Sequence, residues 1–373
     1  MKPAVIKLSC AGFTLPEVVN ATRNEMKLTC YALTGATLAT LAAVPLAASA
    51  ANLTGAGATF PAPVYAKWAE VYHAKTGNAL NYQAIGSGGG VKQIQGKTVD
   101  FGASDDPVPG DELQKSGLIQ FPAVIGGVVP VVNLAGVAPG KMVLDANVIA
   151  AIYSGKVKKW NDPVIAKLNG GLQLPDQAIT PVYRSDSSGT TAVFTGYVAE
   201  LVPQFEKDVG SGKTVNWPSG IGGKGNAGVA ANVMKLSGSI GYVEYAYAKQ
   251  NKLAHTALLN KAGKTVQPDD KTFAAAAAGA DWSKAPGLGI SLNNQAGEEA
   301  WPITSASFIL MQKDPSKPAQ SNEVLKFFKW ALTEGQQLAL DLDYVPMPAA
   351  TLPLIQATWK EIKGAADMAA AGK

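Results

Sequence analysis

Two long apolar runs, one in each half of the chain, limit how this protein can fold. Residues 119–134 read IQFPAVIGGVVPVVNL, and residues 301–311 read WPITSASFILM. Uncharged runs of this length, rich in β-branched residues, are expected of strands buried on both faces of a sheet. A complete series of strand and helix patterns lies between them. The chain should therefore leave a first domain, build a second, and return to complete the first.

The other patterns favour the α/β class. Strand-like segments at residues 79–85, 99–103 and 179–183 each run into a turn of Gly, Ser or Asp, and helical spacing follows. We expect two α/β lobes joined by crossing strands, with a ligand cleft between them. The predicted lobe 1 comprises residues 51–130 and 301–373, and the predicted lobe 2 comprises residues 131–300.

Residues 184–191 read RSDSSGTT and connect a strand pattern to a helical one. The first N–H groups of a helix have no partner within the helix, so this turn can bind an anion. Arg184 adds a planar fork that suits phosphate, sulfate or carboxylate, and Ser188 and Thr190 add neutral donors. The alternative is an ordinary capped helix, because Ser, Thr and Asp are preferred caps.

Two further turns repeat this arrangement. Residues 53–61 (LTGAGATFP) place Thr59 and Phe60 at the start of a helix that Pro63 opens. Residues 86–90 (GSGGG) are expected to form a glycine-rich turn around Ser87, with a helix from residue 91. The sequence thus offers three helix N-termini with small or hydroxyl side chains.

Asp105 and Asp106 follow the strand pattern at residues 99–103. Ligands of open α/β sheets bind at the carboxyl ends of the strands, which places both carboxylates near the predicted cleft. Each Asp could instead cap a helix. We expect Asp106 to cap or face solvent.

The composition excludes several function classes. The 373 residues are 47% hydrophobic and 16% charged, with a net charge of +4, and no block of Lys or Arg suggests nucleic acid as a partner. Two histidines, His73 and His255, are too few for a histidine-rich metal site, and we expect no metal and no cofactor. The expected protein is a monomer.

Residues 1–50 are expected to be a leader, with a secretory signal peptide at about residues 26–50. An apolar run at residues 32–48 follows Met26 and Lys27, and Ala48, Ser49 and Ala50 fit the cleavage rule for small residues. Both cysteines, Cys10 and Cys30, fall in this leader. The mature protein would begin at Ala51 in the periplasm, free of disulfides.

Two glycine-rich motifs resemble nucleotide-binding sequences. Residues 210–214 (GSGKT) look like the end of a P-loop, but Lys207 stands where that motif needs glycine. Residues 220–225 (GIGGKG) fit the dinucleotide fingerprint, with Glu244 as the candidate ribose ligand. Pro218 and Ser219 separate this motif from the preceding apolar residues, so a glycine loop lining the cleft is preferred.

An enzyme is the alternative to a binding protein. The chain lacks the Gly-x-Ser-x-Gly elbow of many serine hydrolases, and neither histidine lies in a recognisable triad context. A two-metal phosphatase would need more ligands than two histidines provide. We therefore expect no catalytic residues, and keep a secreted phosphohydrolase or phosphotransferase as the alternative.

Four motifs together resemble a known family. They lie at residues 53–63 (LTGAGATFPAP), 100–105 (DFGASD), 188–190 (SGT) and 241–251 (GYVEYAYAKQN). This chain resembles, from Ala51 onward, the periplasmic phosphate-binding proteins of the bacterial Pst ABC transporter. The resemblance implies a fold like that of type II periplasmic binding proteins, high-affinity binding of inorganic phosphate, and delivery to membrane permease subunits that work with a cytoplasmic ATPase. A receptor for another tetrahedral oxyanion, such as sulfate, remains an alternative.

The resemblance also implies a ligand set. The phosphate ligands it implies are Thr59, the Phe60 N–H, Ser87, Asp105, Arg184, Ser188, the Gly189 N–H and Thr190. From the residues themselves, Asp186 is expected to pair with Arg184 and hold it in place, or only to cap the helix. Two residues depart from the family pattern. Gly88 stands where a second serine is often found, and Ser187 replaces a glycine, which suggests backbone strain at Ser187.

Overall fold

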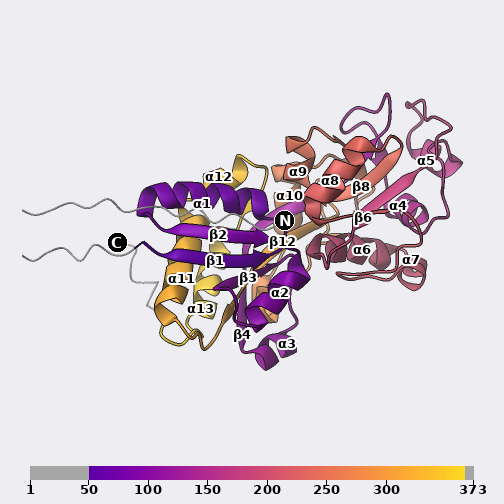
Figure 1. The fold of residues 1–373 in the computed structure, drawn as a ribbon. Coiled ribbons are helices and arrows are strands. Elements are labelled where there is room, and N and C mark those ends of the chain that lie inside the picture. The colour runs from indigo at the N-terminus through magenta and orange to yellow at the C-terminus, as the bar shows by residue number, and fades with distance from the viewer. Residues whose placement is uncertain (1–49, 366–373) are drawn as a thin grey trace, which may run out of the picture. The chain divides into compact units, whose positions relative to one another are not determined.

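The computed structural model describes residues 50–365, which are built around one long mixed sheet (Figure 1). Eight strands follow one path, and β13 (Val345–Pro346) and β9 (Ala254–His255) pair with its strand β4. In order along the sheet, the path is β2 (Ala79–Ala84), β1 (Asn52–Gly57), β3 (Phe101–Ser104), β12 (Thr304–Gln312), β4 (Leu118–Asn133), β8 (Ser239–Glu244), β6 (Thr180–Arg184) and β7 (Ile221–Gly223). The predicted α/β class is confirmed.

The two apolar runs are the central strands of this sheet. All but the last residue of β4 are buried, and β12 lies antiparallel to its first half, from Leu118 to Gly127. The second half of β4, from Val128, pairs with β8. Strand β4 therefore belongs to both ends of the sheet, as expected of a crossing strand. The division into two lobes itself stays a prediction.

Helices pack around the sheet at both of its ends. The helices are α1 (Ala62–Thr76), α2 (Ser87–Gln95), α3 (Gly110–Ser116), α4 (Ala146–Tyr153), α5 (Pro163–Leu168), α6 (Gly189–Leu201), α7 (Pro203–Asp208), α8 (Gly225–Lys235), α9 (Tyr245–Gln250), α10 (Asp270–Ala277), α11 (Pro318–Thr333), α12 (Gln336–Leu340) and α13 (Leu352–Trp359). Figure 1 shows α1, α11 and α13 beside β1 to β4, and α4, α6 and α8 beside β6 and β8. A small second sheet contains β11 (Thr265–Val266), β10 (Ala257–Leu259) and β5 (Val143–Leu144). No helix within residues 50–365 is long and apolar enough to span a membrane.

The turn around Ser87 differs from its prediction, because α2 begins at Ser87 and not at residue 91. The glycines at positions 88–90 form the first turn of this helix. A Cβ on Gly90 would lie 2.5 Å from the Cα of Gly57 and 2.6 Å from the carbonyl oxygen of Ala56. The helix start thus packs directly on the backbone of β1, which only glycine permits at this position.

Gly88 and Ser187, the two residues that depart from the family pattern, lie next to each other in space. A Cβ on Gly88 would lie 2.1 Å from Ser187 Oγ and 2.6 Å from Ser187 Cβ. The Ser187 side chain therefore fills the volume that a residue larger than glycine would need at position 88. Ser187 is not among the residues with positive φ, so the expected strain at this position is wrong.

The C-terminal helices are shorter than the sequence pattern predicts. The helical spacing of Leu325, Phe328 and Leu332 predicts one helix over residues 323–340. The structure divides this segment into α11 and α12 at Gly335, whose carbonyl accepts the Trp68 indole N–H at 2.9 Å. A Cβ on Gly335 would lie 2.9 Å from Ala331 Cα, which explains the glycine at this break. The final helix, expected over residues 354–365, is α13 and ends at Trp359.

Candidate anion-binding site

Each of the three predicted turns follows the carboxyl end of a parallel strand, two of them beside β1 and the third on the far side of the two central strands, after β6. Strand β1 pairs in parallel with β2 and β3, and β6 pairs in parallel with β8. The turn after β1 carries Thr59, the turn after β2 carries Ser87, and β6 ends at Arg184. Helices α1, α2 and α6 begin at or just after these turns, so their first N–H groups are further hydrogen-bond donors beside the side chains of the turns.

Ser87 connects two of the turns. Its hydroxyl oxygen accepts hydrogen bonds from the Gly189 N–H at 3.1 Å and the Asp105 N–H at 3.2 Å. A Cβ on Gly189 would lie 2.4 Å from Ser87 Oγ, so this approach requires glycine. Residues 102 positions apart in the chain therefore meet at the start of α6.

Thr59 and Thr190 meet through a residue that the sequence did not single out. The side-chain amide of Asn226 donates to Thr59 Oγ1 at 2.8 Å and to Thr190 Oγ1 at 3.2 Å, and its Oδ1 accepts from the Glu244 N–H at 2.9 Å. Asn226 is fully buried in α8. The sequence feature that could have identified Asn226 is its position directly after the glycine-rich residues 220–225.

Arg184 is buried and held by its predicted partner. Asp186 accepts from Nε at 2.8 Å and from Nη2 at 2.5 Å, while Nη1 donates to Thr190 Oγ1 at 3.2 Å. Burial would raise the pKa of Asp186, but the hydrogen bonds and charge of Arg184 and the Gly225 N–H outweigh it and lower that pKa. The guanidinium therefore lies beside an ionised carboxylate and the start of α6.

Asp105 has a different environment, although it is also buried. Burial is the main cause that raises the pKa of its carboxyl to about 7, against the opposing effects of Ser307, Arg184 and Ser87. The Ser307 hydroxyl donates to Oδ1 at 2.9 Å and the Ser87 hydroxyl lies 3.4 Å from Oδ2. Asp105 can therefore exist in either protonation state near neutral pH.

Ser307 is the second residue that sequence reasoning missed. It lies in β12, fully buried, where the register shifts beside β4. Ser305, two residues earlier, donates to the carbonyl of Asp105 at 2.9 Å. Three hydroxyl residues within the otherwise apolar run at residues 301–311 were the only signal.

Ser188 and Phe60 lie in the same group. Ser188 is fully buried, and its oxygen accepts the Thr191 N–H at 3.0 Å, which caps α6 while leaving the hydroxyl proton for another acceptor. Phe60 is buried at the start of α1, and its carbonyl accepts a hydrogen bond from the Tyr344 hydroxyl at 2.6 Å. All eight predicted ligands thus belong to one buried cluster.

Asp106 is partly exposed and forms an ion pair with Lys213 at 2.7 Å. Lys213 belongs to the P-loop-like residues 210–214, and its carbonyl accepts the Ser188 N–H at 2.9 Å. Asp106 was expected to cap or face solvent, and this ion pair had not been expected. The second nucleotide-like motif contains the short strand β7 and the first residue of α8.

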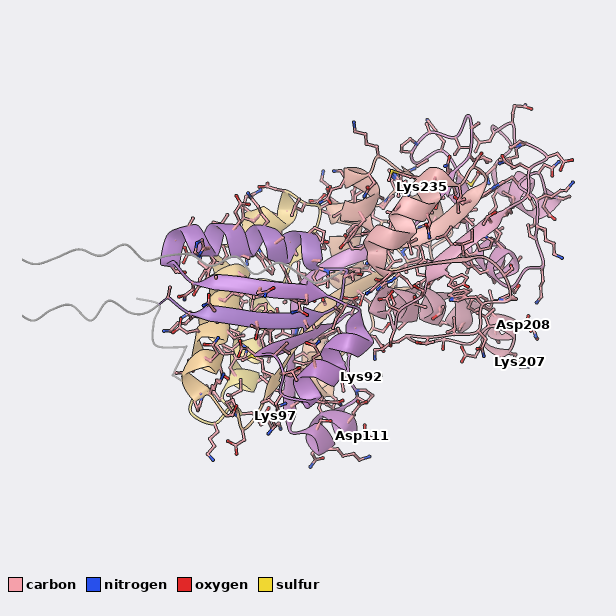
Figure 2. The ribbon with its side chains drawn as sticks, in the orientation of Figure 1. Lys92, Lys97, Asp111, Lys207, Asp208 and Lys235 are labelled. Atoms are coloured by element: carbon pink, nitrogen blue, oxygen red, sulfur yellow. The ribbon has the colours of Figure 1, made fainter. Side chains whose placement is uncertain are left out.

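Many charged side chains outside the cluster are exposed to solvent, whereas those of the cluster are buried. Figure 2 labels exposed charged side chains that project from the outer helices or from the turn after α2, including Lys92, Asp111, Lys207 and Lys235. Arg184 and Asp105, by contrast, are at most 5% exposed. Within residues 50–365, no group of three or more His, Cys, Asp or Glu could hold a metal ion.

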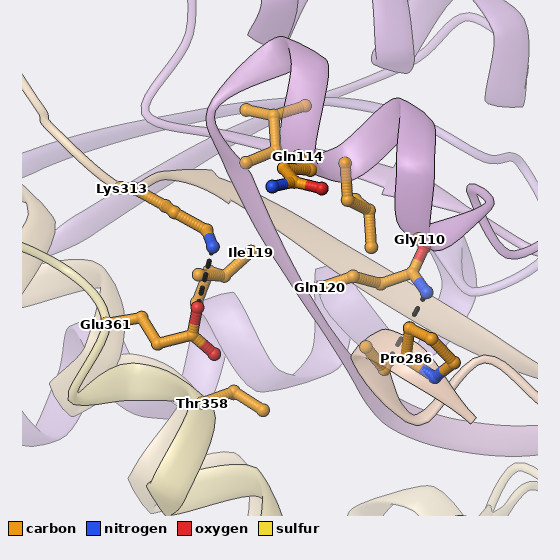
Figure 3. A pocket seen from close by; sticks show the side chains of 11 residues that line it. Gly110, Gln114, Ile119, Gln120, Pro286, Lys313, Thr358 and Glu361 are labelled. Carbon is orange, nitrogen blue, oxygen red and sulfur yellow. Dashed lines mark hydrogen bonds and ion pairs between the residues drawn. The ribbon is translucent and has the colours of Figure 1, made fainter. Parts of the chain in front are cut away.

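A cavity of about 320 Å³ lies away from this cluster (Figure 3). It is bounded by α3, the first residues of β4, Pro286 and α13, and its edge carries the Lys313–Glu361 ion pair of 2.7 Å. None of the predicted ligands lines it. No sequence motif predicts a ligand in this cavity.

Residues 42–334 match the family model of the PBP superfamily domain. Two similar relatives are both named phosphate-binding protein PstS. The protein from Pasteurella multocida is 55% identical over 319 residues, covering 85% of this chain and 93% of the relative. The protein from Haemophilus influenzae is 53% identical over 321 residues, covering 86% of this chain and 96% of the relative.

The fold is similar to that of solved structures. One, a phosphate-binding protein from Stenotrophomonas maltophilia, aligns with a TM-score of 0.64 and covers 84% of this chain and 96% of the other, at 20% identity. A likeness at this identity concerns the fold alone. The predicted fold, like that of periplasmic binding proteins, is confirmed.

Proposed function

This chain belongs to the PBP superfamily and, within it, to the PstS phosphate-binding proteins, and on that basis we propose that it binds inorganic phosphate for an ABC-type importer. The observation that carries the proposal is the buried cluster around Arg184, in which three helix N-termini and several hydroxyl groups meet. Family membership favours a binding protein over an enzyme. A phosphohydrolase or phosphotransferase is therefore not favoured.

The proposed ligands surround an oxyanion with donors that add little net charge. Arg184 supplies the charge, and the hydroxyl groups and N–H groups supply directed hydrogen bonds. The proposed phosphate ligands are Thr59, the Phe60 N–H, Ser87, Asp105, Arg184, Ser188, the Gly189 N–H and Thr190, with Asp186 fixing the orientation of Arg184. Their burial would strengthen each bond by excluding water.

Asp105 would make the site selective. Phosphate near neutral pH always carries at least one proton and can donate it to a carboxylate, whereas sulfate offers only acceptors. An ionised Asp105 facing sulfate would leave two acceptors in contact and add like-charge repulsion. We therefore propose that Asp105 rejects sulfate.

We further propose that the protein acts as a periplasmic monomer. Closure of the predicted lobes over phosphate would present the loaded form to membrane permease subunits that work with a cytoplasmic ATPase. The predicted signal peptide supports this location, but it lies outside the described residues. No cofactor is needed for this function.

An equilibrium binding experiment tests the proposed function. Calorimetry on the wild-type protein should give tight binding of phosphate and much weaker binding of sulfate and of a phosphate ester. Release of phosphate from the ester should not occur, and turnover would support the hydrolase alternative. Sulfate binding as tight as that of phosphate would overturn the selectivity assignment.

A further inference from the structure

The turn that carries Thr59 and Phe60 is held by two tyrosines from distant segments. Tyr247, in α9, donates to the Thr59 carbonyl at 2.6 Å, and Tyr344, just before β13, donates to the Phe60 carbonyl at 2.6 Å. The Thr59 carbonyl and the Phe60 N–H belong to one planar peptide unit. The Tyr247 bond therefore fixes the direction of the N–H that is proposed to bind phosphate.

The Tyr344 hydroxyl has a second short contact, at 2.7 Å to Oε2 of Glu244. A phenol has one proton, and a carbonyl oxygen can only accept. If that proton goes to Phe60, the proton between Tyr344 and Glu244 must come from the carboxyl group. The other carboxyl oxygen of Glu244 accepts the Ala246 N–H at 3.0 Å, which places the acid proton on Oε2.

The surroundings of Glu244 favour this protonated form. Glu244 is fully buried, and burial is the main cause that raises the pKa of its carboxyl to about 8. The hydrogen bonds with Ala246 and Tyr344 lower that pKa, whereas nearby Asp343 and Asp105 raise it, and Asp343 is itself paired with Lys249 at 2.7 Å. The titratable or charged groups that act on or beside Glu244 are Tyr245 and Tyr247 of α9, Asp343 and Tyr344 before β13, Asp105 after β3, and Lys249.

We propose that Glu244, Tyr247 and Tyr344 are positioning residues for the phosphate-binding turn, and that Glu244 acts there as a protonated hydrogen-bond donor at neutral pH. This inference rests on the proposed function, because the turn matters as a phosphate ligand. Ionised Glu244 would compete with the Phe60 carbonyl for the one Tyr344 proton. One acceptor would lose its partner, and phosphate binding would weaken as Glu244 ionises.

The decisive variant is Glu244→Gln. The glutamine amide can donate to Tyr344 as the acid does, and its oxygen can accept from Ala246. We expect unchanged phosphate affinity at neutral pH, and affinity higher than that of the wild-type protein by about tenfold at pH values above the Glu244 pKa. The ionisation of phosphate itself also changes with pH, but it affects both proteins equally, so the two affinities are compared at each pH. Weaker binding by Glu244→Gln at neutral pH would overturn the proposal.

Two further variants separate positioning from general packing. Tyr344→Phe removes both bonds of the hydroxyl and should weaken phosphate binding by about tenfold at neutral pH. Tyr153→Phe is the matched control, since its buried hydroxyl is hydrogen-bonded to the backbone carbonyls of Val182 and Ile240, at 3.4 and 3.3 Å, and not to the turn that carries Thr59 and Phe60. Equal losses of affinity in both variants would overturn the assignment to Tyr344.

The protonation of Glu244 has a readout that needs no phosphate. The infrared spectrum of the ligand-free protein at neutral pH should contain a protonated carboxyl band that is lost in Glu244→Gln. Absence of this difference would overturn the donor role even if phosphate binds. If wild-type protein fails to bind phosphate but the band is present, the proposed function fails and the protonation of Glu244 stands.

Discussion

Arg184 and Asp186 are two residues apart and joined by two hydrogen bonds, of 2.8 and 2.5 Å. The side chain of Arg184 is 1% exposed and that of Asp186 is 12% exposed. Asp186 also accepts the Gly225 N–H at 2.9 Å, which ties the pair to the start of α8. These bonds fix the direction of the guanidinium, so less freedom is lost when an anion binds.

Arg184→Ala should weaken phosphate binding strongly while the protein remains folded. A hydrogen bond to a charged group contributes about 1.5–3 kcal/mol, so we expect a loss of roughly ten- to a hundredfold in affinity by calorimetry. Lys207→Ala, at an exposed position of α7, is the control and should bind as the wild type does. An unchanged dissociation constant for Arg184→Ala would place the site elsewhere.

Asp105→Asn should relax the discrimination against sulfate. The amide can donate to sulfate and still accept from phosphate, so the phosphate affinity should change less than the sulfate affinity. Asp106→Asn is the control because Asp106 pairs with Lys213 at the surface. Competition binding at neutral pH measures the ratio, and a change confined to Asp106→Asn would contradict the assignment.

Asn226→Ala should destabilise the protein and weaken phosphate binding. It leaves the buried hydroxyls of Thr59 and Thr190 without the amide donor, at a cost of roughly 1–3 kcal/mol in the free energy of unfolding. Asn232→Ala in the same helix loses one exposed bond of 3.2 Å to Gly222 and is the matched control. Urea unfolding and calorimetry check both effects, and equal stabilities of the two variants would contradict this role.

Stability should fall as the pH rises through the pKa values of two buried acids. The pKa of Asp105 is raised from 3.8 to about 7 and that of Glu244 from 4.5 to about 8, in both cases mainly by burial. Between the pKa values of the unfolded and the native state, the native protein binds more protons than the unfolded protein. The contribution of the two acids to stability is therefore present below about pH 4 and lost by about pH 8.

The double variant with Asp105→Asn and Glu244→Gln tests this pH dependence. It should show a flatter dependence of the free energy of unfolding on pH than the wild-type protein does, measured by urea unfolding without phosphate. Identical slopes for the two proteins would mean that these acids are ionised in the native state.

The mature protein should begin at Ala51. The predicted leader ends in three small residues, which fit the cleavage rule of secretory signal peptides. N-terminal sequencing of protein recovered from the periplasm checks this prediction. Retention of Met1 or Met26 in the recovered protein would contradict cleavage at this point.

The sequence by itself determined the local units of this protein. The apolar runs predicted β4 and β12, because a strand buried on both faces needs apolar side chains in both directions. The turns around Thr59, Ser87 and Arg184 were visible because helix starts and tight turns depend on neighbouring residues. Their chemistry as donors followed from residue type alone.

Only the tertiary structure decided which distant groups complete the cluster. Ser307 reaches Asp105 across 202 positions and Tyr344 reaches Phe60 across 284, and neither contact leaves a local pattern. The raised pKa values of Asp105 and Glu244 were equally hidden, because a pKa depends on burial and on nearby charges brought together by folding. Local periodicity fixes the elements, whereas long-range packing sets the electrostatics of the site.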